Sequence, residues 1–170
     1  FLSDPDPTAR PEGPVHTTSS AGPAARFDAP VKRAAEPDAA GDVLFSGAFA
    51  PGAPLGITMT GTGTLYVADL FSGQTVAYDA SLAVVDSFAH PTGTATTSGV
   101  AYDTQNGTLW WLNADTNDLV EGTLAGTATG ATIPLAGSPD GLIGGVEYDP
   151  HTDRFFYVDI VSDDIYAVDR

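Results

Sequence analysis

The chain has 170 residues, 42% of them hydrophobic, and a formal net charge of −16 from 22 acidic and 6 basic residues. It has no cysteine, which excludes disulfides and thiolate metal sites, and no apolar run approaches the roughly 18 residues of a membrane helix. No lysine or arginine occurs between Gly41 and Asp153, so the sequence lacks the cationic surface that phosphate recognition requires. We therefore expect neither nucleic acid nor a membrane as a partner.

Residues 1–40 differ in composition from the rest of the chain. They hold seven of the thirteen prolines and show no alternating apolar pattern. Such a segment cannot bury enough apolar surface to offset the entropy lost on ordering. We expect a disordered leader or linker over 1–40 and a folded region over 41–170. Because the chain begins with Phe1, we expect a mature or excised product of an extracellular or periplasmic protein.

From residue 41 onward, short strands alternate with turns rich in Gly, Pro, Asn and Asp. One outer strand is expected over 41–50, and three related segments follow over 54–90, 97–136 and 143–170. Each segment opens with a glycine-containing strand, and the glycines are spaced by 43 and 46 residues; they are Gly56, Gly99 and Gly145. A period of roughly 40 to 50 residues is typical of one four-stranded propeller blade.

The first two segments each divide into four expected strands, and the third into three. These strands are 56–60, 64–69, 74–79 and 82–89 in the first segment, and 98–103, 108–113, 118–124 and 130–135 in the second. Asn106-Gly107 indicates a two-residue hairpin. The sequence thus predicts an all-β β-propeller segment of about three four-stranded blades: one outer strand, two full blades and three strands of a further blade.

We expect this segment to be part of a six-bladed ring, since closed rings have about 4 to 8 blades. Two assemblies would complete such a ring. One is a homodimer in which each copy donates its outer strand to the last blade of the other. The alternative is a longer chain of which this sequence is a fragment.

Two of the segments resemble known propeller families. Pro54–Ile57 followed by Gly63–Asp69 is similar to the NHL repeat, and Tyr148–Pro150 followed by Tyr157–Ile160 is similar to the SMP-30/gluconolactonase blade. Together these resemblances cover about 42–170 and imply YVTN/NHL-type blades. The second resemblance also implies metal-dependent lactone hydrolysis, with a divalent cation held by a glutamate at the start of an inner strand.

The gluconolactonase resemblance does not extend to that glutamate. Gly144 stands at the matching position, and Glu147 comes three residues later. A shift of three residues turns a strand side chain to the opposite face of the sheet. We therefore expect no metal site and no cofactor in this segment.

Five residues are candidates for ligand binding. Asp69, Asn113 and Asp159 each end the second strand of a segment, where they would either form a polar ring around one end of the channel or cap the following turn. Trp110 and Trp111 point to opposite faces of one strand. Each would either pack between blades or present a platform for a sugar or peptide.

No catalytic constellation accompanies these residues. The turn from Asn113 to Asp118 lacks the glycine and glutamate spacing of a calcium loop. His16, His90 and His151 have tail or turn neighbours, so we expect them to be exposed in loops. Apolar positions matched between strands are expected to be buried between blades, and these are Ile57, Val67, Val76, Val100, Leu112, Val146 and Val158.

The sequence therefore favours a non-catalytic binding or structural module of an exported protein, with a protein or carbohydrate ligand. The alternative is a lactonase-type, metal-dependent hydrolase in which most ligands lie outside this segment.

Overall fold

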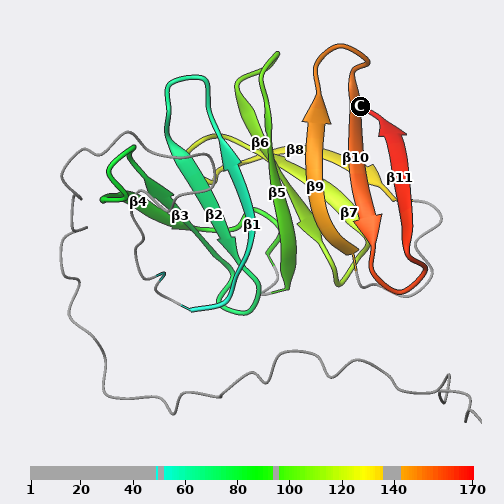
Figure 1. Cartoon of the computed structure of the whole chain (residues 1–170), viewed down its shortest axis with the longest axis horizontal. Helices are drawn as coiled ribbons and strands as arrows, with labels where there is room; N and C mark the ends of the chain where they lie inside the picture. Colours follow the sequence, from blue (N-terminus) through cyan, green and yellow to red (C-terminus); the bar gives the residue numbers. More distant parts are fainter. Residues whose placement is uncertain (1–48, 50–51, 94–95, 136–142) are drawn as a thin grey trace, which may run out of the picture.

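The computed structural model describes residues 49, 52–93, 96–135 and 143–170 of the chain. These residues form strands and turns, and none of them belongs to a helix long and apolar enough to cross a membrane. The strands make three antiparallel sheets that lie side by side (Figure 1). The predicted all-β partial propeller is therefore confirmed.

Each sheet is built from strands that follow one another in the chain, in the order expected for a blade. The first sheet contains β1 (Pro54–Met59), β2 (Leu65–Asp69), β3 (Gln74–Tyr78) and β4 (Val84–Ala89). The second sheet contains β5 (Thr97–Asp103), β6 (Thr108–Asn113), β7 (Asp118–Gly122) and β8 (Ala128–Pro134). The third sheet contains β9 (Ile143–Asp149), β10 (Arg154–Asp159) and β11 (Asp164–Asp169). The expected leader over 1–40 lies outside the described residues, as does the expected strand over 41–50 apart from Phe49.

The turn between β5 and β6 differs from the predicted two-residue hairpin. Asp103 pairs with Thr108, so four residues form the loop, and the Gly107 amide donates to the Asp103 carbonyl at 2.8 Å. Gly107 adopts a φ of 71°, which glycine reaches at little cost. The prediction was wrong because the carboxylate of Asp103 accepts hydrogen bonds from two loop amides and so favours the longer loop.

The inner strands β1, β5 and β9 lie close to one another because small residues face the contact. A Cβ added to Gly56 would come within 2.7 Å of the Gly99 Cα atom and of the Val100 amide nitrogen. Backbone cannot yield at that distance, so the packing of β1 against β5 requires glycine at position 56. The 43-residue spacing seen in the sequence therefore has a physical cause in the first interface between blades.

Two apolar cores join the three sheets. The core between the first and second sheets contains Tyr66, Ala68, Ala77, Val100, Leu109 and Trp111. The core between the second and third sheets contains Ala101, Trp110, Leu112, Leu119, Leu135, Val146, Tyr148, Phe155 and Tyr157. Each large apolar side chain buried in this way contributes about 1.5–3 kcal/mol to folding. The blades are thus held together mainly by the faces that they turn toward one another.

The burial predicted for matched apolar positions is correct at most of these positions and wrong at two of them. Val76, Val100, Leu112 and Val146 are buried, and Val67 is half-buried. Ile57 is 62% exposed and Val158 is 37% exposed. Alternation turns these two side chains away from the second sheet, onto the outer faces of the first and third sheets, where no described residue covers them fully.

Candidate functional site

Asp69, Asn113 and Asp159 occupy one end of the three sheets. Each ends the second strand of its sheet and pairs with the start of the inner strand, where the partners are Pro54, Thr97 and Ile143. Because the inner strands are neighbours, the three residues lie at the same end of the assembly. All three side chains are buried. We call the loops that follow them, residues 70–73, 114–117 and 160–163, the cap loops.

The Asp69 carboxylate accepts hydrogen bonds from three backbone amides. Oδ1 accepts from the amides of Phe71 (3.0 Å) and Ser72 (2.6 Å), and Oδ2 accepts from the amide of Ala53 (2.7 Å). Burial alone raises the pKa of this carboxyl, but these amides outweigh burial, and the pKa lies below its ordinary value of 3.8. Asp69 therefore holds its own loop and joins that loop to the start of β1.

The other two cap loops repeat this geometry. Asp159 Oδ1 accepts from the amides of Val161 (2.9 Å) and Ser162 (3.3 Å), and Asn113 Oδ1 accepts from the amide of Asp115 (3.0 Å). The fourth residue of each loop has a positive φ, and these residues are Gly73, Asn117 and Asp163. Gly, Asn and Asp tolerate that conformation better than other residues. In this structure the three side chains act as caps, and a role for them in ligand binding stays a prediction.

Further carboxylates cap the turns at the other end of the sheets, where the first strand of a sheet leads into the second. Asp103 Oδ1 accepts from the amides of Gln105 and Asn106, at 2.8 and 3.1 Å. Asp149 accepts from the His151 amide at 2.9 Å and from the Thr152 hydroxyl at 2.7 Å. These hydrogen bonds hold the pKa of Asp149 below its ordinary value. Most of the recurring acidic residues are thus bound to the chain's own backbone.

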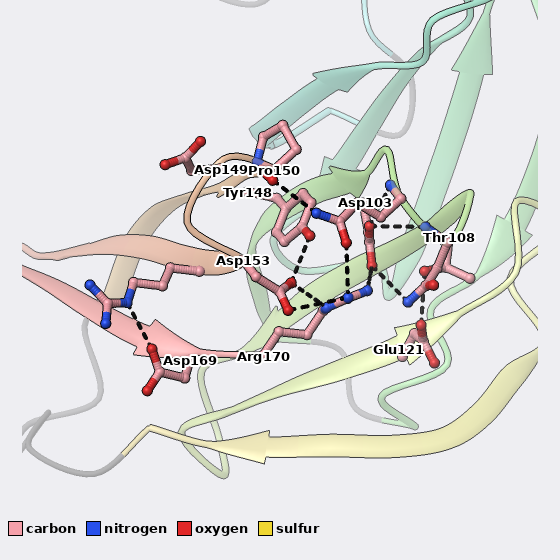
Figure 2. Close-up of polar contacts among 12 residues, drawn as sticks. Asp103, Thr108, Glu121, Tyr148, Asp149, Pro150, Asp153, Asp169 and Arg170 are labelled. Carbon is pink, nitrogen blue, oxygen red and sulfur yellow. Dashed lines mark hydrogen bonds and ion pairs between the residues drawn. The ribbon is translucent and has the colours of Figure 1, made fainter.

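A polar cluster around Arg170 joins the second sheet to the third (Figure 2). The guanidinium donates from Nη1 to Asp103 Oδ2 at 2.8 Å and forms an ion pair with Asp153, with Nε 2.6 Å from Oδ1. It lies 5.7 Å from the centre of the Tyr148 ring. The Tyr148 hydroxyl donates to Asp153 at 2.8 Å. Burial, together with this hydrogen bond, raises the pKa of Tyr148 to about 12. The Gln105 amide group also reaches the Pro150 carbonyl at 2.8 Å.

The two tryptophans pack in different cores. Trp111 is completely buried between the first and second sheets, and its Nε1 donates to the Thr75 hydroxyl at 2.8 Å. Trp110 is buried between the second and third sheets, with its ring centre 5.1 Å from that of Phe155. Both rings are packing groups in this structure. A binding role for either ring stays a prediction, and it would require the blades to separate.

The prediction of exposed histidines is wrong for His90. This side chain is only 5% exposed, and its ring centre lies 6.5 Å from that of Trp111. Burial lowers its pKa, so the imidazole is neutral at pH 7. His151 is exposed, beside Asp149, and His16 lies outside the described residues.

Within residues 49, 52–93, 96–135 and 143–170, no group of three or more His, Cys, Asp or Glu side chains is placed to hold a metal ion. In the turn that resembles a calcium loop, Thr116 donates to Asp118 at 2.7 Å and the Asn117 amide donates to the Asn113 carbonyl at 3.0 Å. Glu147 lies on the outer face of the third sheet, far along the strand from Asp159. Among these residues, Asp103 and Asp153 do converge, but on the guanidinium of Arg170.

No protein-family model matches the sequence, and no curated protein matches it either. Solved structures do match. Virginiamycin B lyase from Staphylococcus aureus has a TM-score of 0.54 at 16% identity, over 74% of this chain and 45% of the lyase. Glutaminyl cyclase from Myxococcus xanthus has a TM-score of 0.55 at 15% identity, over 73% of this chain and 60% of the cyclase. A nidogen/laminin complex has a TM-score of 0.52 at 17% identity, over 74% and 47%.

The chain thus spans about half the length of the solved structures that it matches. At this level of identity the similarity extends to the fold alone. Three sheets of repeated strands, joined face to face and matched by these structures, make the chain a partial β-propeller.

Proposed function

We propose that the chain is a non-catalytic binding or structural propeller module of an exported protein. The observation that supports this function is the use of the recurring polar residues. Asp69, Asn113, Asp159 and Asp103 each accept hydrogen bonds from loop amides of the chain itself. A carboxylate whose lone pairs are directed at its own backbone is poorly placed to act as a base, a nucleophile or a metal ligand.

The cap loops are the surface best suited to a ligand. They present exposed apolar side chains above the buried caps: Phe71 is 71% exposed, and Ile160 and Val161 are also exposed. Phe71 and Val161 are equivalent, because each is the second residue after its cap. An exposed aromatic ring on such a loop suits a sugar face or an apolar group of a protein ligand. The lack of basic residues over 41–153 opposes an anionic ligand.

The second candidate is a metal-dependent hydrolase of the lactonase type. Its support is the SMP-30-like third segment and the range of proteins with this fold. The similar structures include enzymes, a lyase and a glutaminyl cyclase, as well as nidogen in a complex with laminin. Because one fold hosts both classes, the residues of this chain must decide between them. Gly144, where that family has its glutamate, favours the module.

Thermal unfolding with and without divalent cations distinguishes the two functions. A cation that binds only the folded state raises its stability by mass action. Because a module of this kind needs no bound cation, we expect the Tm to change by less than about 2 °C in 1 mM calcium, magnesium, manganese or zinc. No hydrolysis of a simple lactone is expected above the spontaneous rate in buffer without protein. A rise of tens of degrees at micromolar metal, or metal-dependent lactone hydrolysis, would instead establish the hydrolase.

A further inference from the structure

The outer face of the third sheet carries exposed apolar side chains whose equivalents in the other two sheets are buried. Ala68, Leu112 and Val158 each directly precede the cap residue of their sheet. Ala68 and Leu112 are completely buried by the next sheet, whereas Val158 is 37% exposed. Ile165 on the neighbouring strand is 76% exposed. This face therefore has the chemistry of a blade interface without a blade against it in one chain.

The outer face of the first sheet is the counterpart. Ile57, Val100 and Val146 each directly follow the inner glycine of their sheet. Val100 and Val146 are buried by the preceding sheet, whereas Ile57 is 62% exposed and Met59, two residues on, is 60% exposed. The repeat thus leaves exposed apolar side chains on one face at each end. On the first sheet they lie on β1, whereas Val76 and Tyr78 on the same face are buried.

The two interfaces inside the chain define how such faces fit. In each of them, the residue before the cap packs in the same core as the residue after the next inner glycine. The pairs are Ala68 with Val100, and Leu112 with Val146. Val158 and Ile57 are the third pair of this series. The same packing therefore continues the existing interfaces if a first sheet is placed against a third sheet.

The third sheet also has a hollow on this face. Its volume is about 270 Å³, and Glu147, Phe156, Val158 and Ile165 line it. Glu147 takes the place of Thr58, whose hydroxyl accepts a hydrogen bond from the Tyr102 amide in the next sheet at 3.2 Å. The amide equivalent to that of Tyr102 in a first sheet is the amide of Met59. A glutamate in this hollow is thus placed to accept a hydrogen bond from a docked inner strand.

From these equivalences we propose that the outer face of the third sheet binds the outer face of the first sheet of a second copy of this chain. A two-fold axis forms the same contact twice, so both pairs of open faces are covered. The resulting ring has six blades, within the range of closed propellers. Phe49 of the same chain packs against one edge of the first sheet's outer face, with its ring 6.5 Å from that of Tyr78, so the docked sheet would contact the part of the face around Ile57 and Met59.

Sedimentation equilibrium of the full 170-residue chain in 150 mM NaCl tests the proposal. The expected mass is twice 17.4 kDa. Val158→Asp and Ile57→Lys should each yield monomers, because each variant places a charge in both contacts of the ring and weakens association by at least about 100-fold. The matched control is Leu124→Asp in the turn between β7 and β8. Leu124 is 37% exposed, as Val158 is, but it lies on neither outer face, so this variant should remain a dimer.

Mixing the two monomeric variants gives the sharpest result. One contact of the mixed ring is unaltered and the other joins Asp to Lys, so an equimolar mixture should recover the dimer. A side-by-side dimer through other surfaces would not show this complementation. Far-ultraviolet circular dichroism checks that each variant is folded, and Ile165→Asp, at a position already 76% exposed, is a second probe of the same face.

The remaining outcomes overturn the proposal. A folded wild-type monomer at 100 μM would mean that the open faces do not bind one another. A dimer that survives both Val158→Asp and Ile165→Asp would place the interface elsewhere. An open polymer would mean that the contact forms but does not close into a six-bladed ring.

Discussion

Replacing Arg170 with glutamine should destabilise the contact between the second and third sheets. Asp103 is completely buried, and Arg170, whose side chain is 20% exposed, donates to it at 2.8 Å. Breaking a buried ion pair costs about 3–5 kcal/mol when nothing replaces the partner. Here Asp103 keeps the amides of Gln105 and Asn106, and the arginine is partly solvated. We therefore expect a loss of about 2 kcal/mol in the free energy of unfolding.

Urea unfolding followed by tryptophan fluorescence measures this loss, at one protein concentration throughout. With an m-value of about 2 kcal/mol/M, the midpoint should fall by about 1 M. Arg154→Gln is the matched control, since it removes the same charge from a chain of net charge −16. Arg154 pairs with Asp169 at 2.7 Å, but both side chains are largely exposed, and the midpoint should hardly move. Equal midpoints for the two variants would refute the role given to Arg170.

Three further changes test the packing and the caps. Gly56→Ala should destabilise the chain by about 3 kcal/mol or more in urea unfolding, because the new Cβ meets backbone at 2.7 Å, whereas Gly61→Ala, with open space around it, should be close to neutral. Trp111→Phe should cost about 1–2 kcal/mol by removing the donor to Thr75, and a double-mutant cycle with Thr75→Val should show coupling between them; additive losses would argue against the hydrogen bond. The Asp69 carboxyl has a lowered pKa in the folded state, so it contributes stability above its ordinary value of 3.8 and loses that contribution as the pH falls through the folded pKa. The difference in urea midpoint between wild type and Asp69→Asn should therefore be largest near pH 7 and shrink below pH 4, and a difference that does not vary with pH would contradict this.

The repeat in the sequence was sufficient to predict the sheets, because it reports a local property. Alternation and turn residues repeat in each segment, and the strands begin and end within a few residues of the expected positions. Alternation also identifies which side chains share a face, but it does not tell whether another blade covers that face. Ile57 and Val158 were therefore expected to be buried, although they lie at the two open ends.

The details of the polar residues depend on contacts that are distant in the sequence. His90 was expected to be exposed because Pro91 follows it, yet Trp111 covers its ring. Arg170 contacts Asp103 across 67 residues, and no local pattern indicates that pairing. The cap loops do carry a local signal: an Asp or Asn followed four residues later by Gly, Asn or Asp with a positive φ. That spacing favours the capping interpretation, which the sequence alone had left open.

The central claim is that the recurring carboxylates serve the fold. Hydrogen–deuterium exchange with and without 1 mM calcium tests it most directly, through the amides of Phe71, Ser72, Val161 and Ser162. Each of these amides donates to Asp69 or Asp159. The account predicts that they exchange slowly without metal and that calcium leaves their rates unchanged. Asp69→Ala should speed exchange at Phe71, Ser72 and Ala53 but not at Val161 or Ser162. Rapid exchange without metal, followed by protection when calcium is added, would contradict it and would make these carboxylates cation ligands.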